Sequence, residues 1–178
     1  AGLLRPKNGN VCVDGMESKD RRPEMLREIY VVPEEYNLPN LTLKQYVKVH
    51  QDFYPRFSEE ILMNCLRDFE MQADVNFKHL SMGQKKKIYM SFAVASCCQL
   101  LLMDEPTNGL DIPSKALFRK VIAGNLPADS SLIISTHQVH DVEQLLDHVF
   151  ILNNSEMIIN ASVEEIAKQY EFTYRNAN

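Results

Sequence analysis

Two adjacent carboxylates, Asp104 and Glu105, are the residues of this sequence best placed to do chemistry. They follow the apolar run 100–103, which is too short for a buried helix and is typical of a strand inside a parallel sheet. Ligands of open α/β sheets bind where the carboxyl ends of the strands lie. Acids at that edge can hold a divalent cation or take a proton from water. A buried strand that merely ends in two surface acids would give the same pattern.

Five further candidate site residues lie before and after this strand. They are Ser81, Gly83, Gln84, Asp111 and His137. Ser81 and Gln84 form a capping box, which predicts a helix N-terminus where free amides favour an anion, although any helix can begin in this way. Asp111 is predicted to cap a helix that begins near Pro113 and ends at Gly124. His137 follows a second short apolar strand, 132–135.

Together these segments resemble the signature, Walker B, D-loop and switch-histidine motifs of ATP-binding cassette (ABC) proteins. The motifs read Leu-Ser-Met-Gly-Gln at 80–84, Leu-Leu-Leu-Met-Asp-Glu at 100–105, Asp111, and Ile-Ile-Ser-Thr-His at 133–137. The resemblance runs from Gly2 to about Tyr170. It implies an ATP-binding and ATP-hydrolysing subunit of an ABC transporter, cytoplasmic and peripheral at the inner face of the membrane, with ATP and Mg²⁺ as cofactors.

The resemblance also implies roles for individual residues. Asp104 would orient Mg²⁺, Glu105 would act as general base on the attacking water, and His137 would stabilise the transferring phosphoryl group. Ser81, Gly83, Gln84 and Asp111 would contact the nucleotide or the partner across a dimer interface. Two positions depart from the family pattern. Met82 replaces the first glycine of the signature, and Glu34 replaces a glutamine that senses the metal, so Glu34 is either a weaker metal ligand or an exposed loop acid.

The implied fold is α/β, with a P-loop NTPase-like, mostly parallel sheet and an inserted helical subdomain. The sheet core would comprise 1–37 and 97–178, and the helical subdomain 38–96 would dock a membrane permease subunit or present an amphipathic packing face. A second ABC ATPase subunit, identical or related, would complete the dimer. Nucleic acid is not expected as a partner, because the net charge of the chain is −5. A cassette protein acting in translation or DNA repair is a weaker alternative.

The sequence contains no Gly-x-x-x-x-Gly-Lys-Ser/Thr motif, the Walker A loop that binds the β- and γ-phosphates. We therefore expect the first strand and the P-loop helix to be absent, and the chain to be the carboxyl-terminal part of a longer ATPase. Alone it should be inactive and marginally stable, with an open sheet edge beside 132–135. The alternative is a non-catalytic ABC-derived binding or dimerisation module that cannot bind ATP alone.

The composition indicates the class of protein. With 178 residues, 45% of them hydrophobic and 24% charged, the chain is typical of one globular domain, and no apolar run approaches the ~20 residues of a membrane helix. The adjacent Cys97 and Cys98 indicate small buried thiols in a reduced protein. The run 85–87 of three lysines is predicted to be a solvated helix face. His137 and His140 form a His-x-x-His pair, for which no third metal ligand is found.

Further elements follow from local patterns. Strands are predicted at 11–13 and 29–32, a hairpin at 150–152 and 157–159 with an Asn153-Asn154 turn, and capping boxes at Thr42–Gln45 and Ser162–Glu165. A polar tail is predicted at 173–178. A buried helical stripe is predicted from the spacing of Ile61, Leu62, Cys65, Leu66 and Phe69.

Overall fold

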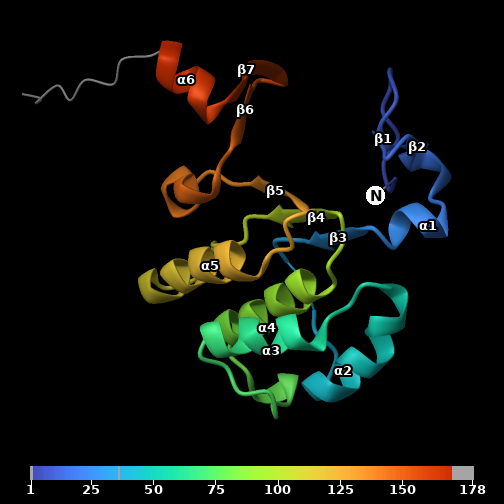
Figure 1. The fold of residues 1–178 in the computed structure, drawn as a ribbon, viewed down its shortest axis with the longest axis vertical. Helices are drawn as coiled ribbons and strands as arrows, with labels where there is room; N and C mark the ends of the chain where they lie inside the picture. The colour runs from blue at the N-terminus through green and yellow to red at the C-terminus, as the bar shows by residue number, and fades with distance from the viewer. Residues whose placement is uncertain (1, 36, 170–178) are drawn as a thin grey trace, which may run out of the picture. The chain divides into compact units, whose positions relative to one another are not determined.

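A computed structural model describes residues 2–35 and 37–169, which form two compact units, 2–141 and 142–169 (Figure 1). The predicted polar tail at 173–178 lies outside the described residues. Every residue predicted to do chemistry lies in the first unit.

Three parallel strands form the sheet of the first unit, in the order β3 (Ile29–Val32), β4 (Leu100–Asp104) and β5 (Ser131–Ser135). Asp104 lies opposite Ser135 in the register. All three strands therefore end at the same edge, as the apolar runs predicted. Among the residues that the structure describes, β5 is an edge strand, and its Ile133 is exposed.

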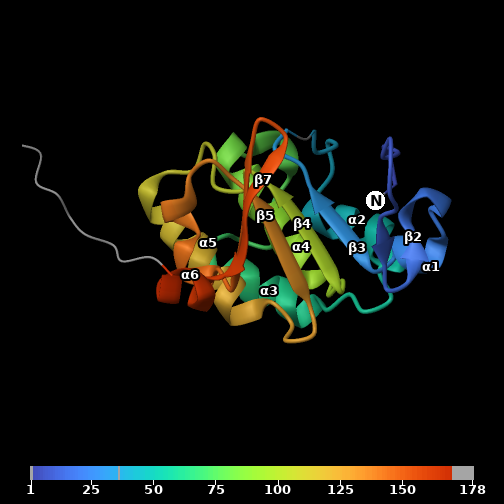
Figure 2. The same ribbon diagram turned by 90° about the horizontal axis from the view of Figure 1, so that it is seen from above.

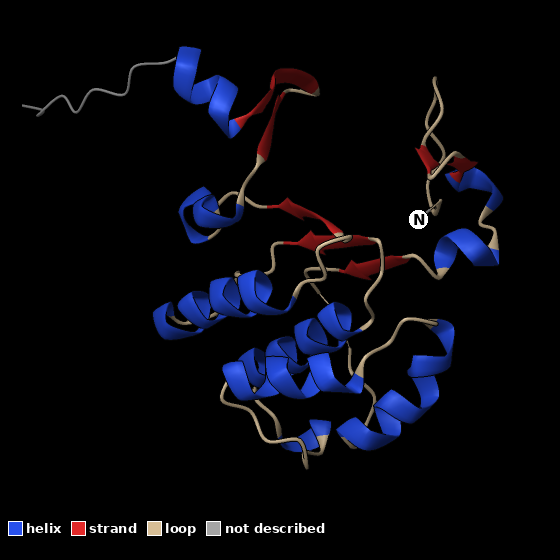
Figure 3. Ribbon diagram, in the orientation of Figure 1, coloured by secondary structure: helices blue, strands red, loops and turns tan. Residues whose placement is uncertain are grey.

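The segment between β3 and β4 is helical, as predicted (Figure 3). It contains α2 (Leu43–His50), η2 (Gln51–Phe53), α3 (Glu59–Asp68), η3 (Phe77–His79) and α4 (Met82–Ala95). The capping boxes predicted for α2 and α4 are both confirmed. Four residues of the predicted stripe are buried, and the first is partly exposed. The buried ones are Leu62, Cys65, Leu66 and Phe69, and the partly exposed one is Ile61.

Helix α4 is apolar on nearly every side beyond its second turn, because it lies between the sheet and α3 (Figures 1 and 2). Phe92 is fully buried, and its ring centroid lies 5.1 Å from the centroids of Tyr46 and Phe57 and 5.9 Å from that of Tyr30. Tyr30 belongs to β3, so this aromatic cluster fixes the signature helix against the sheet. Burial of such rings dominates core energetics.

Helix α5 (Ile112–Asn125) begins as predicted, because the Asp111 side chain accepts a hydrogen bond of 2.9 Å from the Ser114 amide. The prediction that Gly124 ends this helix is wrong by one residue. Asn125 stays helical because its side chain donates to the Val121 carbonyl and to Asp68 of α3. Near the N-terminus are β1 (Cys12–Val13), β2 (Met16–Glu17), η1 (Ser18–Asp20) and α1 (Pro23–Leu26). The short helix η4 (Val139–Asp141) ends the unit.

The second unit contains η5 (Glu143–Leu145), the hairpin β6 (His148–Asn153) and β7 (Glu156–Ser162), and α6 (Val163–Gln169). The predicted hairpin is confirmed, but its turn is Asn154-Ser155, where both residues have positive φ. The Ser162–Glu165 capping box is confirmed. No helix among residues 2–35 and 37–169 combines the length and apolar character that a bilayer crossing requires.

Candidate functional site

The carboxyl edge of the sheet brings Asp104 beside the end of β5. The Ser135 hydroxyl donates a hydrogen bond to the Asp104 carboxylate, which is otherwise exposed. This contact orients the carboxylate at the edge where open α/β sheets bind ligands. The next residue, Glu105, leaves the strand with a left-handed backbone (φ +43°), and its amide donates to the Ser135 carbonyl over 2.9 Å.

The Glu105 carboxylate is held by the residues that follow β5. One oxygen accepts from the Thr136 hydroxyl at 3.0 Å, and the other accepts from the His137 amide at 3.0 Å and lies 2.8 Å from His137 Nδ1. Burial alone would raise the pKa of Glu105, but these hydrogen bonds outweigh it and hold that pKa below its ordinary value. Glu105 is therefore ionised at neutral pH, in contact with the predicted switch histidine.

The N-terminus of α4 places the signature residues near the D-loop. The Ser81 hydroxyl accepts the Gln84 amide at 3.2 Å, and the Gln84 side-chain oxygen accepts the Ser81 amide at 3.0 Å. A Cβ on Gly83 would lie 4.0 Å from Cδ2 of Leu110, the residue before Asp111. Gly83 therefore lies near the residue before Asp111, and Ser81 and Asp111 cap α4 and α5. The Met82 side chain is exposed at the same end.

Glu34 has a partner that the sequence did not indicate. Its Oε1 accepts a hydrogen bond of 2.7 Å from the side-chain amide of Asn108, which lies in the turn after the acidic pair. The two residues are 74 positions apart, so no local pattern connects them. This contact ties the loop after β3 to the turn after β4.

Lys86 contradicts the prediction of a solvated lysine face. It is only 6% exposed, and its ammonium group donates to the backbone carbonyls of Glu105 and Asn108, each over 2.8 Å. The prediction is wrong because the Lys86 side chain reaches two carbonyls of a turn that lies 19 and 22 residues further along the chain. Helical spacing does not single it out, since Lys87 also lies four residues before a buried residue, Ser91. Lys85 and Lys87 are partly exposed.

A second charged cluster that sequence reasoning missed supports the loop of His137. Lys115 on α5 forms an ion pair of 2.7 Å with Asp141 and donates over 2.6 Å to the side chain of Gln138, the neighbour of His137. Arg119 donates to the Asp141 backbone carbonyl at 3.2 Å. Burial raises the pKa of Asp141, and the bonds from Lys115 outweigh that effect, so the pKa lies below its ordinary value.

The donor set at the edge fits a hard divalent cation. Mg²⁺ is usually bound through one or two carboxylates, with water and substrate phosphates completing the octahedron. Asp104 offers such an oxygen, and Glu34 offers a second that is shared with Asn108. Within 2–35 and 37–169, no cluster of three or more His, Cys, Asp or Glu side chains could hold a metal by itself. His137 and His140 thus have no described third ligand.

Comparison with known proteins assigns this arrangement to a family. The family model described as "ABC transporter" matches residues 1–108, more than half of the chain. The chain belongs to the ABC transporter family. This confirms the resemblance, and the matched residues include the predicted signature and Walker B motifs at 80–84 and 100–105.

Two curated ABC relatives illustrate the match. The ABC transporter ATP-binding protein YtrB of Bacillus subtilis is 24% identical over 170 residues, covering 94% of this chain and 58% of the relative. The energy-coupling factor transporter ATP-binding protein EcfA2 of Clostridium perfringens is 26% identical over 188 residues, covering 96% of this chain and 64% of the relative. The chain thus spans roughly three fifths of the length of these relatives.

A solved structure confirms the P-loop NTPase-like α/β fold. The structure of an ATP-binding subunit of an ABC transporter superposes with a TM-score of 0.80 at 24% identity, over 94% of this chain and 72% of the other. The fold class predicted from the sequence is therefore correct.

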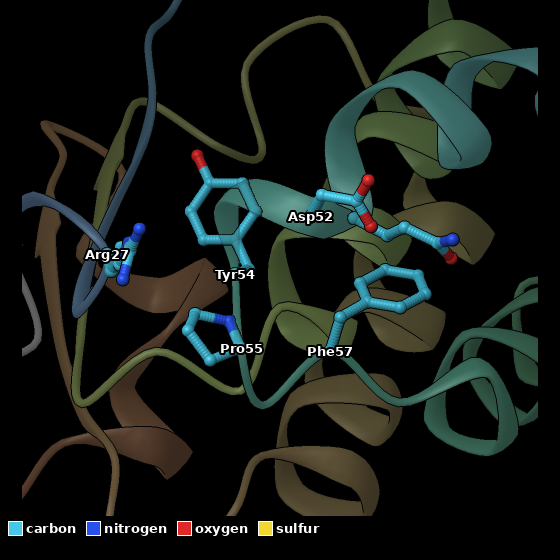
Figure 4. Close-up of a pocket in the computed structure, with 6 residues that line it drawn as sticks. Arg27, Asp52, Tyr54, Pro55 and Phe57 are labelled. Carbon is cyan, nitrogen blue, oxygen red and sulfur yellow. The ribbon is translucent and has the colours of Figure 1, made fainter.

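A separate pocket of about 400 Å³ lies beside the helical segment (Figure 4). Its lining residues are Arg27, Gln51, Asp52, Tyr54, Pro55 and Phe57. It shares none of the residues predicted to bind nucleotide. Figure 4 shows the aromatic rings of Tyr54 and Phe57 beside Pro55, with a basic and an acidic side chain among the lining residues.

Proposed function

We propose that this chain forms the hydrolytic part of an ABC ATPase subunit that energises transport through a separate membrane subunit. The observation that carries the proposal is the Glu105 carboxylate, held by Thr136 and His137 next to Asp104 at the carboxyl edge of the sheet. In this proposal residues 1–37 and 97–178 form the ATPase core, and 38–96 form the helical subdomain.

In this reaction the chain's own residues supply the general base and orient it. Glu105 accepts a proton from the attacking water, and His137, hydrogen-bonded to Glu105, keeps the carboxylate in register with the phosphoryl group. Asp104, oriented by Ser135, would hold Mg²⁺, with Glu34 as a weaker candidate. When bound, Mg²⁺ neutralises charge on the β- and γ-phosphates of ATP. A positioned base contributes roughly 10²–10⁴-fold to the rate.

A second ATPase subunit, identical or related, completes the site in this proposal. Ser81, Gly83 and Gln84 open a helix of 14 residues, whose free amides favour a phosphate group. Asp111 follows Leu110, whose Cδ2 would lie 4.0 Å from a Cβ placed on Gly83. The γ-phosphate of ATP bound by the partner would meet this helix end, so the four residues belong to the dimer interface.

The membrane partner docks on the helical subdomain in this proposal, which places the protein at the inner face of the membrane. The open pocket lined by Tyr54 and Phe57 lies in this segment, and we propose it as part of the docking surface.

The test uses Glu105→Gln, which keeps the side-chain size and one of the two acceptor oxygens but removes the base. In the native protein that carries this substitution, we expect ATP turnover to be at least about 10²-fold lower than in the wild type. ATP binding should persist, and a nucleotide-bound dimer should accumulate on size-exclusion chromatography. Glu143→Gln, a carboxylate of the second unit, is the matched control. Hydrolysis at the native rate by Glu105→Gln would remove Glu105 from this role.

The second class of function, a binding or dimerisation module that does not hydrolyse ATP, predicts a different result. The 178 residues contain no Walker A motif, so ATP binding by this chain should be compared with binding by the native protein including any residues that precede Ala1. A native protein that dimerises but neither binds nor hydrolyses ATP would support the module.

A further inference from the structure

We propose that Lys86 is a positioning residue for hydrolysis, because its ammonium group clamps the turn that carries Glu105 to the signature helix α4. The inference rests on the proposed function, since it assigns a role in aligning the proposed base. Lys86 lies two residues beyond Gln84, in the second turn of the helix whose N-terminus carries Ser81.

The contact geometry is that of a clamp on one turn. The Asn108 amide donates to the Glu105 carbonyl over 3.1 Å, which closes a four-residue turn of Glu105, Pro106, Thr107 and Asn108. Lys86 Nζ bridges the carbonyls of the first and last of these residues, each at 2.8 Å. One buried cation therefore fixes both ends of the turn.

The turn needs an external clamp because its first residue is strained. Glu105 has φ +43°, a left-handed conformation that side chains with a Cβ rarely adopt, and such conformations persist only where the surroundings impose them. The Glu105 amide is bound to Ser135 on one side and its carbonyl to Lys86 on the other. With the peptide groups on both sides of Glu105 held, the direction of its Cα–Cβ bond is fixed, and the hydrogen bonds with Thr136 and His137 then orient the carboxylate.

Burial makes the clamp strong and specific. Hydrogen bonds from an ionised donor are roughly twice as strong as neutral ones, and a site shielded from water strengthens them further. Burial lowers the pKa of Lys86, and the nearby carboxylates of Glu34 and Glu105 oppose that effect. Glu34 in turn accepts from the Asn108 side chain, so the loop after β3 is fixed to the same turn.

The experiment compares Lys86→Met, which keeps the aliphatic stem, with Lys86→Arg, which keeps the charge and several donors. Lys85→Met is the matched control, because it removes the same charge from the preceding, more exposed position of the same helix. Hydrogen exchange of the Glu105 and Asn108 amides reports the turn without any need for ATP. ATP hydrolysis by the native protein reports the alignment of the base.

We expect Lys86→Met to speed amide exchange in the turn by at least about tenfold, the effect of losing hydrogen bonds to a charged donor. The kcat should fall by about 10- to 100-fold while the KM for ATP stays within about twofold, because misplacing a reacting group by about 1 Å has an effect of this size. Lys86→Arg should recover most of the loss, and Lys85→Met should match the wild type in both measurements.

Two results would overturn the inference. One is turn exchange in Lys86→Met equal to that of Lys85→Met. The other is a kcat in Lys86→Met equal to the wild type despite faster exchange. If Lys86→Met does not fold, Lys86→Arg decides the question. A folded Lys86→Arg protein with wild-type turn exchange and wild-type kcat supports the clamp. A folded Lys86→Arg protein with a tenfold lower kcat refutes a role that depends on the charge and the donors. A wild type that hydrolyses no ATP refutes the proposed function instead, while the exchange comparison still tests the clamp.

Discussion

The ion pair between Lys115 and Asp141 should contribute measurably to the stability of the 2–141 unit. The Asp141 side chain is 13% exposed and that of Lys115 is 21% exposed, and their charged atoms lie 2.7 Å apart. Exposed ion pairs contribute about 0–1 kcal/mol, whereas removing one partner of a fully buried pair costs about 3–5 kcal/mol. For this partly buried pair we expect Lys115→Met to cost about 2 kcal/mol, between those limits.

Urea unfolding followed by tyrosine fluorescence measures this cost, since the protein has seven tyrosines and no tryptophan. With a urea dependence of about 2 kcal/mol per molar, the midpoint should fall by about 1 M. Lys120→Met is the control on the same helix: its lysine is 64% exposed and pairs with Asp68 at 3.1 Å, so its cost should be at most about 0.5 kcal/mol.

The pH dependence has a definite sign. The pKa of Asp141 is lower in the folded protein than in the unfolded chain, so the pair stabilises the fold fully above the unfolded value of about 3.9 and loses its effect as the pH falls through the folded value. The difference between wild type and Lys115→Met should therefore be largest at neutral pH and shrink in acid. Equal costs for Lys115→Met and Lys120→Met at pH 7, or a difference that does not change in acid, would refute this reasoning.

Two further predictions concern the core and the thiols. Phe92→Ala should destabilise the protein by about 3–5 kcal/mol in the same urea assay, because it empties the centre of the aromatic cluster; a cost below about 1 kcal/mol would contradict the packing described. In the native protein at pH 8 we expect a thiol-specific reagent to modify the exposed Cys12 quickly and all four cysteines only after denaturation, because burial raises the pKa of Cys65 to about 12 and of Cys98 to about 11. Rapid reaction of more than one thiol before denaturation would argue against this burial.

Strands, caps and the acidic edge could be predicted because each depends on a short stretch of sequence or on a general rule of sheet geometry. The apolar run before Asp104 predicted a strand that delivers its acids to the carboxyl edge of the sheet, and the resemblance to ABC proteins implied that Asp104 and His137 serve one site. The Ser81 capping box needed only four residues. These features would be recognisable in any sequence context.

The contacts that hold the acidic turn could not be predicted in the same way. Asn108 meets Glu34 across 74 positions, and Lys115 meets Asp141 across a strand and two loops. Such pairs depend on how elements pack, and no local pattern encodes them. Lys86 is the instructive case: a run of three lysines is polar on average, but the middle one donates hydrogen bonds to carbonyls of a turn 19 and 22 residues away, a contact that the run itself does not indicate.

The left-handed backbone at Glu105 separates what is good for folding from what is good for chemistry. Glycine adopts this conformation without steric penalty, and asparagine and aspartate tolerate it better than most residues. Selection for stability alone would therefore favour those residues at position 105, whereas selection for hydrolysis would retain the glutamate that we propose as the base. In a population of variants that is not selected for activity, we expect substitutions of Glu105 to appear early.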